Sequence, residues 1–210
     1  MNKKYTMLTI LSLLAIGIAW YSFYLSSLHK VSFETKGNFS TVDVYKRYPS
    51  EKISTVDLQK KESLSLPNDN YYVILPDSEY DQTPVYFTVN SKDLTVSINP
   101  NYSDAHLGVL LETEQPTIYE IVNKYLNSEG ARDYTIKKGT LFEKGEWFGG
   151  VLVNKKADNN NPKDTYRVIL KKDNESWSVV TTPMIIFSSA ALPDIPIEVL
   201  RKVNALHADD

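Results

Sequence analysis

The sequence of 210 residues contains no cysteine and only three histidines. The absence of cysteine excludes disulfides, iron–sulfur clusters and thiol chemistry. His29, His106 and His207 form no His-x-His or His-Glu-x-x-His motif, so no zinc site is expected. Only His106 lies where a catalytic triad is conceivable, and its neighbours show no nucleophile elbow. With no glycine-rich phosphate loop either, we expect no metal and no cofactor.

The chain also lacks any cluster of basic residues. Lysine and arginine number 23, against 26 aspartates and glutamates, which gives a net charge of −3 at pH 7. A nucleic-acid surface needs clustered cations that neutralise phosphates, so nucleic acid is not an expected partner. The density of tyrosine, asparagine and lysine is typical of bacterial proteins.

Formal charge is missing from residues 5–29, which are rich in leucine and isoleucine. About 20 such residues cross a bilayer as a helix, and no small-x-small cleavage site follows. We therefore expect a retained transmembrane helix over residues 5–28, with the lipid bilayer as its partner. Lys3 and Lys4 place a tail of residues 1–4 in the cytoplasm and the bulk outside the cell membrane. Because the charge bias is small, a cytoplasmic bulk is the alternative.

Apolar and polar residues alternate from Val31 to Ile98, which is typical of half-buried β-strands. Turn residues separate the runs, and the segment 67–70 (Pro-Asn-Asp-Asn) is expected to form a tight hairpin. The pattern predicts a small antiparallel β-sandwich over residues 31–99. Its seven strands are expected around Val31/Phe33, Val42/Val44, Val56/Leu58, Leu64/Leu66, Tyr71/Val73/Leu75, Val85/Phe87/Val89 and Leu94/Val96/Ile98.

Two segments of this region resemble a known family. Residues 41–46 (Thr-Val-Asp-Val-Tyr-Lys) and 64–75 (Leu-Ser-Leu-Pro-Asn-Asp-Asn-Tyr-Tyr-Val-Ile-Leu) are similar to the PEGA-type surface β-repeat and its prealbumin-like relatives. The sequence departs from that pattern at Asn70, where the family usually has glycine, and it lacks the Pro-Gly-Ala signature. The resemblance implies a non-catalytic β module outside a bacterial cell.

A different pattern begins beyond Pro100. Residues 100–116 are expected to form a linker, and residues 117–120 (Thr-Ile-Tyr-Glu) fit a capping box that starts a helix ending at Gly130. Alternating strands follow, and the two prolines of residues 193–196 start a final helix. The order helix, antiparallel sheet, helix predicts an α+β domain over residues 117–207. The expected fold is thus a membrane anchor, an all-β sandwich and an α+β domain.

One candidate site lies in this second domain. Glu143 and Glu146 flank a turn beside Trp147, and a pair of carboxylates near an aromatic ring is how a glycosidase can be built. The same residues suit an ordinary hairpin in which water keeps both pKa values near their usual range, and we favour that interpretation. Gly149 and Gly150 indicate either a concave ligand surface beside Trp147 or room for a helix packed on the sheet, the latter being favoured.

A polar loop offers oxygens that calcium would accept, from Asp158, Asn160 and Asp164. Pro162 breaks the pattern of a calcium loop, and no bidentate glutamate follows. A metal site is therefore not expected there.

These observations predict a membrane-anchored, extracytoplasmic binding or scaffold protein of the bacterial cell envelope, without catalysis of its own. Its partner would be an envelope protein or a glycan. One alternative is a structural subunit of a secretion, pilus or division assembly, which an exposed apolar patch on the second domain would favour. The other is an enzyme acting on cell-wall glycan, which would need paired carboxylates in a cleft.

Overall fold

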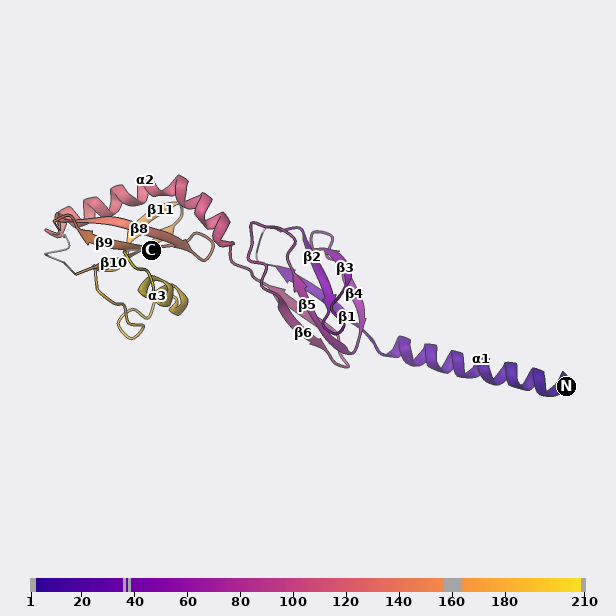
Figure 1. Cartoon of the computed structure of the whole chain (residues 1–210). Coiled ribbons are helices and arrows are strands. Elements are labelled where there is room, and N and C mark those ends of the chain that lie inside the picture. The colour runs from indigo at the N-terminus through magenta and orange to yellow at the C-terminus, as the bar shows by residue number, and fades with distance from the viewer. Residues whose placement is uncertain (1–2, 36, 38, 157–163, 209–210) are drawn as a thin grey trace. The chain divides into compact units, whose positions relative to one another are not determined.

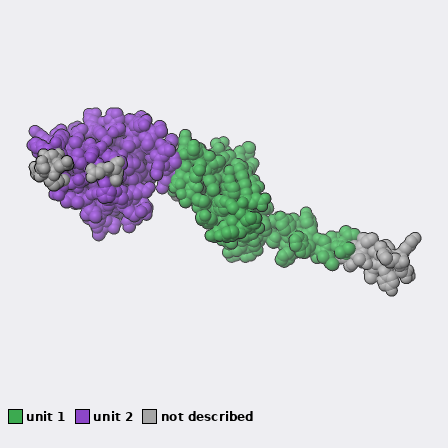
Figure 2. All heavy atoms as spheres, viewed as in Figure 1, with its two compact units in different colours: residues 1–100 green, residues 101–210 purple. Residues whose placement is uncertain are grey.

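The computed structural model describes residues 3–35, 37, 39–156 and 164–208, with the backbone alone for residues 3–12. The chain divides into two compact units, residues 1–100 and residues 101–210 (Figure 2). Among the described residues, no strand of one unit pairs with a strand of the other. The described chain forms three helices and eleven strands, so its fold is mainly β-sheet (Figure 1).

The first helix, α1 (Lys3–Ser26), covers most of the uncharged run. Within the part of the chain that the structure describes, no helix is both long enough and apolar enough to span a membrane. This finding contradicts the predicted single-pass anchor over residues 5–28, and with it the predicted cytoplasmic tail and extracytoplasmic bulk.

Unit 1 contains two β-sheets. In one, β1 (Leu28–Thr35) lies between β4 (Ser63–Pro67) and β7 (Leu94–Ile98). In the other the order is β3 (Glu51–Asp57), β2 (Thr41–Lys46), β5 (Asp69–Ile74) and β6 (Val85–Val89).

The two sheets of unit 1 share a core. The ring of Phe33 on β1 meets that of Phe87 on β6 edge-on, with centroids 6.1 Å apart. The alternation along each strand brings every second side chain into this core. Its fully buried members include Val31, Val42, Val44, Val56, Val73 and Ile98.

All seven alternating runs form strands, but their pairing differs from the prediction in two places. β1 and β7 are parallel, so the sandwich is not wholly antiparallel. β4 pairs with β1, whereas β5 pairs with β2 and β6, so residues 67–70 carry the chain from one sheet to the other and form no hairpin. Long-range contacts hold this crossing: Asp69 forms an ion pair with Lys46 at 2.8 Å, and Asn68 Oδ1 accepts a hydrogen bond from Ser91 N at 2.9 Å.

Unit 2 is a sheet covered by helices on both faces (Figure 1). The strand order is β11 (Ser176–Val179), β10 (Tyr166–Asp173), β9 (Trp147–Asn154) and β8 (Tyr134–Phe142), all antiparallel. One face packs on α2 (Asp104–Ser128) and the other on α3 (Ile197–Asn204). Because both faces are covered, the first six residues of β9 are all buried.

The helix α2 begins at Asp104 and not at Thr117. Ser103 provides the N-cap, since its Oγ accepts a hydrogen bond from His106 N at 3.3 Å. Pro116, the last residue of the predicted linker, lies inside the helix. Residues 104–116, predicted as a linker, are therefore helical, and Leu107 joins the core of unit 2.

A buried arginine joins three segments on the α3 face. Arg167, on β10, is only 9% exposed. Its Nε donates to the carbonyl oxygen of Val203 at 3.0 Å, one Nη donates to that of Leu206 at 2.7 Å, and the other donates to that of Ile185. Val203 lies in the last turn of α3 and Leu206 just beyond its end, where the helix dipole favours a cation. The guanidinium thus caps α3 and fixes the segment after β11.

Glu114 ties α2 to the sheet. Its Oε1 lies 2.6 Å from Lys172 Nζ, and its Oε2 accepts a hydrogen bond from Trp177 Nε1 at 2.8 Å. The hydrogen bond from Lys172, followed by that from Trp177, lowers the pKa of Glu114.

Glu114→Gln is expected to lower the free energy of unfolding by about 1–2 kcal/mol at neutral pH, because charge-assisted hydrogen bonds between largely covered groups are lost. A carboxyl whose pKa is lowered by folding stabilises the protein above its unfolded pKa of about 4.3, and this contribution is lost as the pH falls through the folded pKa. Urea unfolding should therefore show that Glu114→Gln lowers the free energy of unfolding less at about pH 3 than at about pH 7. Glu112→Gln, an exposed change on the same helix, is the control, and a pH-independent deficit at Glu114 would contradict this account.

Candidate ligand pocket

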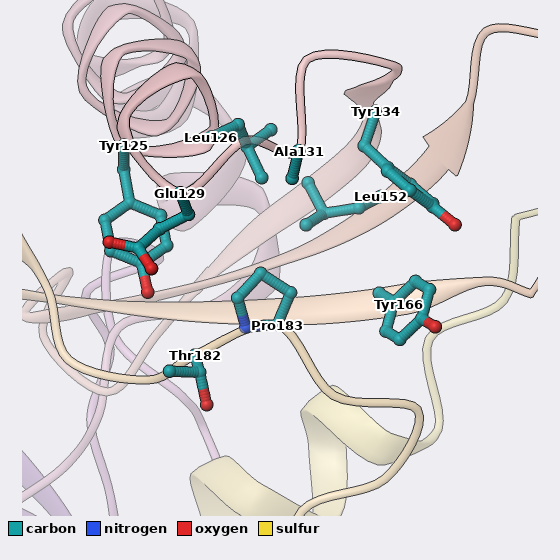
Figure 3. Close-up of a pocket in the computed structure, with 9 residues that line it drawn as sticks. All are labelled: Tyr125, Leu126, Glu129, Ala131, Tyr134, Leu152, Tyr166, Thr182 and Pro183. Atoms are coloured by element: carbon teal, nitrogen blue, oxygen red, sulfur yellow. The ribbon is translucent and has the colours of Figure 1, made fainter.

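A pocket of about 310 Å³ opens at one end of the sheet of unit 2 (Figure 3). Its walls come from the last turns of α2, the first residues of β8 and β10, the far part of β9 and the segment after β11. Its volume suits a small ligand group rather than a large cofactor. The lining residues are Tyr125, Leu126, Glu129, Ala131, Tyr134, Leu152, Tyr166, Thr182 and Pro183.

A sharp turn after α2 brings the lining segments together. Gly130 adopts a φ of 75°, which glycine alone enters without a steric cost. Ala131 N then donates to the carbonyl oxygen of Leu126 at 2.8 Å, and Tyr134 N donates to that of Ala131 at 3.1 Å. β8 therefore starts directly after the helix end, and its first side chain enters the pocket wall.

Two tyrosines and a leucine form the part of the wall that the sheet supplies. Tyr166 lies opposite Leu152 in the β9–β10 register. The rings of Tyr134 and Tyr166 are arranged edge to face, with centroids 5.2 Å apart and an interplanar angle of 85°. This contact fixes two aromatic rings that bear hydroxyl groups, beside the fully buried side chain of Leu152.

Tyr125 and Glu129 lie one turn apart on α2 and form the helical wall. Burial, and after it the negative charge of Glu129, raises the pKa of Tyr125, so its hydroxyl stays neutral at physiological pH. Within the described part of the chain, the Glu129 carboxylate forms no hydrogen bond or ion pair, and it is exposed at the rim. A negative charge beside aromatic rings attracts a cation. The arrangement suits a positively charged group on a small apolar body.

The predicted site residues lie elsewhere in unit 2. Trp147 is 5% exposed and belongs to the core between the sheet and α3, whereas the pocket lies on the α2 face. A Cβ atom at Gly149 would lie 2.3 Å from Val203 Cγ2, and one at Gly150 would lie 2.8 Å from Phe148 Cε1. Beside Gly149 the space is filled by Val203 of α3, as the helix-packing interpretation expects, whereas beside Gly150 it is filled by Phe148 of the sheet itself.

Glu143 and Glu146 lie on the turn between β8 and β9, where Glu143 has a φ of 53° and Gly145 a φ of 77°. Burial, and after it the charge of Glu146, raises the pKa of Glu143, while a hydrogen bond from Trp147 opposes the shift. The expectation that water keeps both groups near their usual pKa is therefore wrong for Glu143, because that side chain is only partly solvated.

The three histidines lie in different parts of the described chain. His29 lies on β1, and His207 follows α3. His106, in α2, packs on Tyr102 just before that helix, with ring centroids 4.5 Å apart. Asp158 and Asn160 lie outside the described residues, and Asp164 is exposed. The described residues contain no group of three histidine, cysteine, aspartate or glutamate side chains able to hold a metal ion.

Neither the comparison with family models nor that with curated proteins gave a match. Among solved structures, the chain is similar to a DUF3823 family protein from Bacteroides ovatus ATCC 8483, with 8% sequence identity. The alignment covers 72% of this chain and 96% of that one, with a TM-score of 0.28. The resemblance to PEGA-type repeats stays a prediction.

Sequence reasoning missed the pocket because its residues were assigned to regular elements. Tyr125 belongs to the apolar stripe of α2, and Tyr134 and Tyr166 each begin an alternating strand. One signal was available: two strands begin with tyrosine, and one of them starts just after the helix-ending Gly130. A tyrosine at a strand start, near a helix end, is placed at the rim of a sheet, where pockets form.

Proposed function

We propose that the protein is a binding protein without catalysis of its own, and that unit 2 holds a small cationic group with an apolar body in its tyrosine-lined pocket. The observation that carries this proposal is the free carboxylate of Glu129 at the rim of a pocket with three tyrosine rings. Cations bind such aromatic surroundings through the ring quadrupoles, and more strongly where water is partly excluded. The apolar floor of Leu126 and Leu152 would take the body of the ligand.

Two probes of equal length test this proposal: hexylammonium and hexanol. Ligand-observed NMR with the full chain should show hexylammonium bound at least about ten-fold more tightly, because a close charge pair and cation–π contacts together exceed about 1.4 kcal/mol. Glu129→Gln should remove most of this preference. Glu120→Gln, also exposed on α2, should leave it unchanged. Equal affinities for the two probes in the wild type would contradict the proposal.

The proposed lack of catalysis requires its own assay, because the pKa of Glu143 is raised and perturbed carboxyls are candidate acids. The full chain is incubated with peptidoglycan and with a panel of esters and peptides, beside Glu143→Gln and Glu146→Gln. We expect no turnover by any of the three proteins. Turnover by the wild type that either substitution abolishes would show that the protein is an enzyme.

One observation favours a second candidate, a structural subunit of a larger assembly. Three consecutive apolar side chains are exposed after β11: Met184 at 41%, Ile185 at 53% and Ile186 at 70%. Exposed apolar patches mark surfaces of association, and Arg167 holds this segment in place through the carbonyl of Ile185. If this patch drives assembly, Ile186→Glu should abolish any self-association seen by light scattering, whereas Glu129→Gln should not.

A further inference from the structure

The outward face of the four-stranded sheet in unit 1 carries a row of tyrosines. Tyr45 on β2 lies opposite Tyr72 on β5, which in turn lies opposite Tyr86 on β6. The rings of Tyr45 and Tyr72 are stacked, with centroids 5.0 Å apart and an interplanar angle of 3°. Those of Tyr72 and Tyr86 are 5.7 Å apart and tilted by 52°. The neighbouring residues Val44 and Val73 point into the core, so the row faces away from it.

A cation and a further tyrosine extend the row. The Arg47 guanidinium lies over the ring of Tyr86 at 5.2 Å and over that of Tyr48 at 5.3 Å. Tyr86 is 61% exposed and Tyr48 70% exposed. We call Tyr45, Tyr72, Tyr86, Arg47 and Tyr48 the tyrosine row.

The charge of Arg47 is not balanced within the described chain. The two nearest lysines in sequence each have an acidic partner at 2.8 Å: Lys46 pairs with Asp69, and Lys52 with Asp43. For Arg47, the described residues supply aromatic rings but no carboxylate. An anionic group of a partner would therefore complete its coordination, and the planar guanidinium matches a carboxylate in two parallel hydrogen bonds.

Sheet stability explains only part of the row. Stacked cross-strand rings stabilise a sheet, which accounts for Tyr45 and Tyr72. It does not account for Tyr86 and Tyr48. These two tyrosines lie against the Arg47 guanidinium and expose most of their surface to water. Large exposed aromatics beside arginine are typical of binding surfaces.

The neighbours of the row favour a polar partner. Ser50 Oγ lies 2.6 Å from the Tyr72 hydroxyl, and Thr88 Oγ1 donates to Asn70 Oδ1 at 2.8 Å, so hydroxyl and amide groups border the rings. A protein interface would also bury a largely apolar centre, whereas hydroxyl and amide groups surround these rings. A nucleic acid would need several cations for its phosphates, whereas the row has one unpaired cation in a chain of net charge −3.

We infer that the tyrosine row binds a polysaccharide that contains uronic acids, with sugar rings against Tyr86 and Tyr48 and a sugar carboxylate on Arg47. This site lies wholly in unit 1 and is independent of the pocket proposed in unit 2. Aromatic rings pack on the apolar faces of sugars, and bordering hydroxyl groups hydrogen-bond to sugar hydroxyls. Because the sugar carboxylate pairs with Arg47, the site binds an acidic polysaccharide more tightly than a neutral one.

Polygalacturonate oligomers and their fully methyl-esterified form test this inference, because the two share a backbone and differ in charge. Titration of the full chain should show polygalacturonate bound at least about ten-fold more tightly than the ester, the fold-change expected for one exposed but oriented charge-assisted pair. Arg47→Gln should abolish this preference, and Tyr86→Ala should weaken binding of both forms about ten-fold, as for loss of one stacked aromatic contact. Lys92→Gln, an exposed cation of unit 1, should change neither.

The inference would be overturned by no binding of polygalacturonate, by equal binding of acid and ester, or by tighter binding of oligothymidylate, which would indicate a phosphodiester partner. An equal loss with Lys92→Gln would also overturn it, since binding would then be unspecific attraction of charge. Circular dichroism of each variant shows whether the sheet is intact, and Arg47→Lys, which keeps the charge but not the planar fork, should restore less than half of the acid preference.

Discussion

Replacing Arg167 with methionine is expected to lower the free energy of unfolding of unit 2 by about 3 kcal/mol or more. The change removes the charged donor that the carbonyl oxygens of Val203, Leu206 and Ile185 share. A hydrogen bond to a charged group contributes about 1.5–3 kcal/mol, although Val203 O keeps its hydrogen bond from Leu206 N. Urea unfolding followed by the fluorescence of Trp147 and Trp177, both in unit 2, measures the loss directly.

The matched control for this prediction is Arg201→Met. Arg201 pairs with Glu198 on the surface of α3, with side-chain exposures of 71% and 61%, and exposed pairs contribute about 0–1 kcal/mol. Arg167→Lys should fall between the two, because one ammonium group keeps the charge but cannot reach three divergent carbonyls. If Arg167→Met lowers the free energy of unfolding no more than Arg201→Met does, the guanidinium of Arg167 does not hold α3 in place.

Gly149→Ala is expected to lower the free energy of unfolding by about 2–3 kcal/mol, which is typical of overpacking a tight core. The new Cβ would lie 2.3 Å from Val203 Cγ2 and 2.8 Å from Phe142 Cε2, so α3 must shift on the sheet. The measurement is again urea unfolding at neutral pH. Gly108→Ala is the control, because nothing lies within 4 Å of its Cβ position in α2, and alanine there should stabilise the helix by about 0.5–1 kcal/mol.

A double-mutant cycle with Val203→Ala separates overpacking from other effects of alanine at position 149. Val203→Ala alone creates a cavity, but in the double variant the new methyl group occupies part of that space. The double variant should therefore lose less stability than the sum of the two single variants. Strict additivity would contradict the close approach of Gly149 and Val203.

The alternation of apolar residues located the strands well, because a half-buried sheet imposes a period of two on any sequence. Pairing partners were harder to predict, since they depend on contacts between distant segments. Residues 67–70 have hairpin chemistry, yet Asp69 is held by Lys46 and Asn68 by Ser91, so the chain leaves one sheet for the other. The parallel alignment of β1 with β7 is likewise invisible in local sequence.

The helix α2 shows a competition between a local signal and tertiary packing. The Thr-x-x-Glu pattern of residues 117–120 indicated a helix start, but Leu107 and Ile118 are buried in one core, which favours a continuous helix through Pro116. The pocket of unit 2 could not be predicted from the sequence, because only the folded geometry brings its residues together. Tyr125, Tyr134 and Tyr166 are distant in sequence, and only the turn at Gly130 and the register of β9 and β10 bring them together.

The central claim is that the pocket of unit 2 binds a cationic group beside Glu129. Its most direct test is to titrate isotopically labelled full chain with hexylammonium and to map the amide shifts by heteronuclear NMR. We predict that the largest shifts fall on residues 125–134, 152, 166 and 182, and that Glu129→Gln removes them while Glu120→Gln does not. Shifts of equal size in the Glu129→Gln variant, or shifts confined to residues outside the pocket, would contradict the claim.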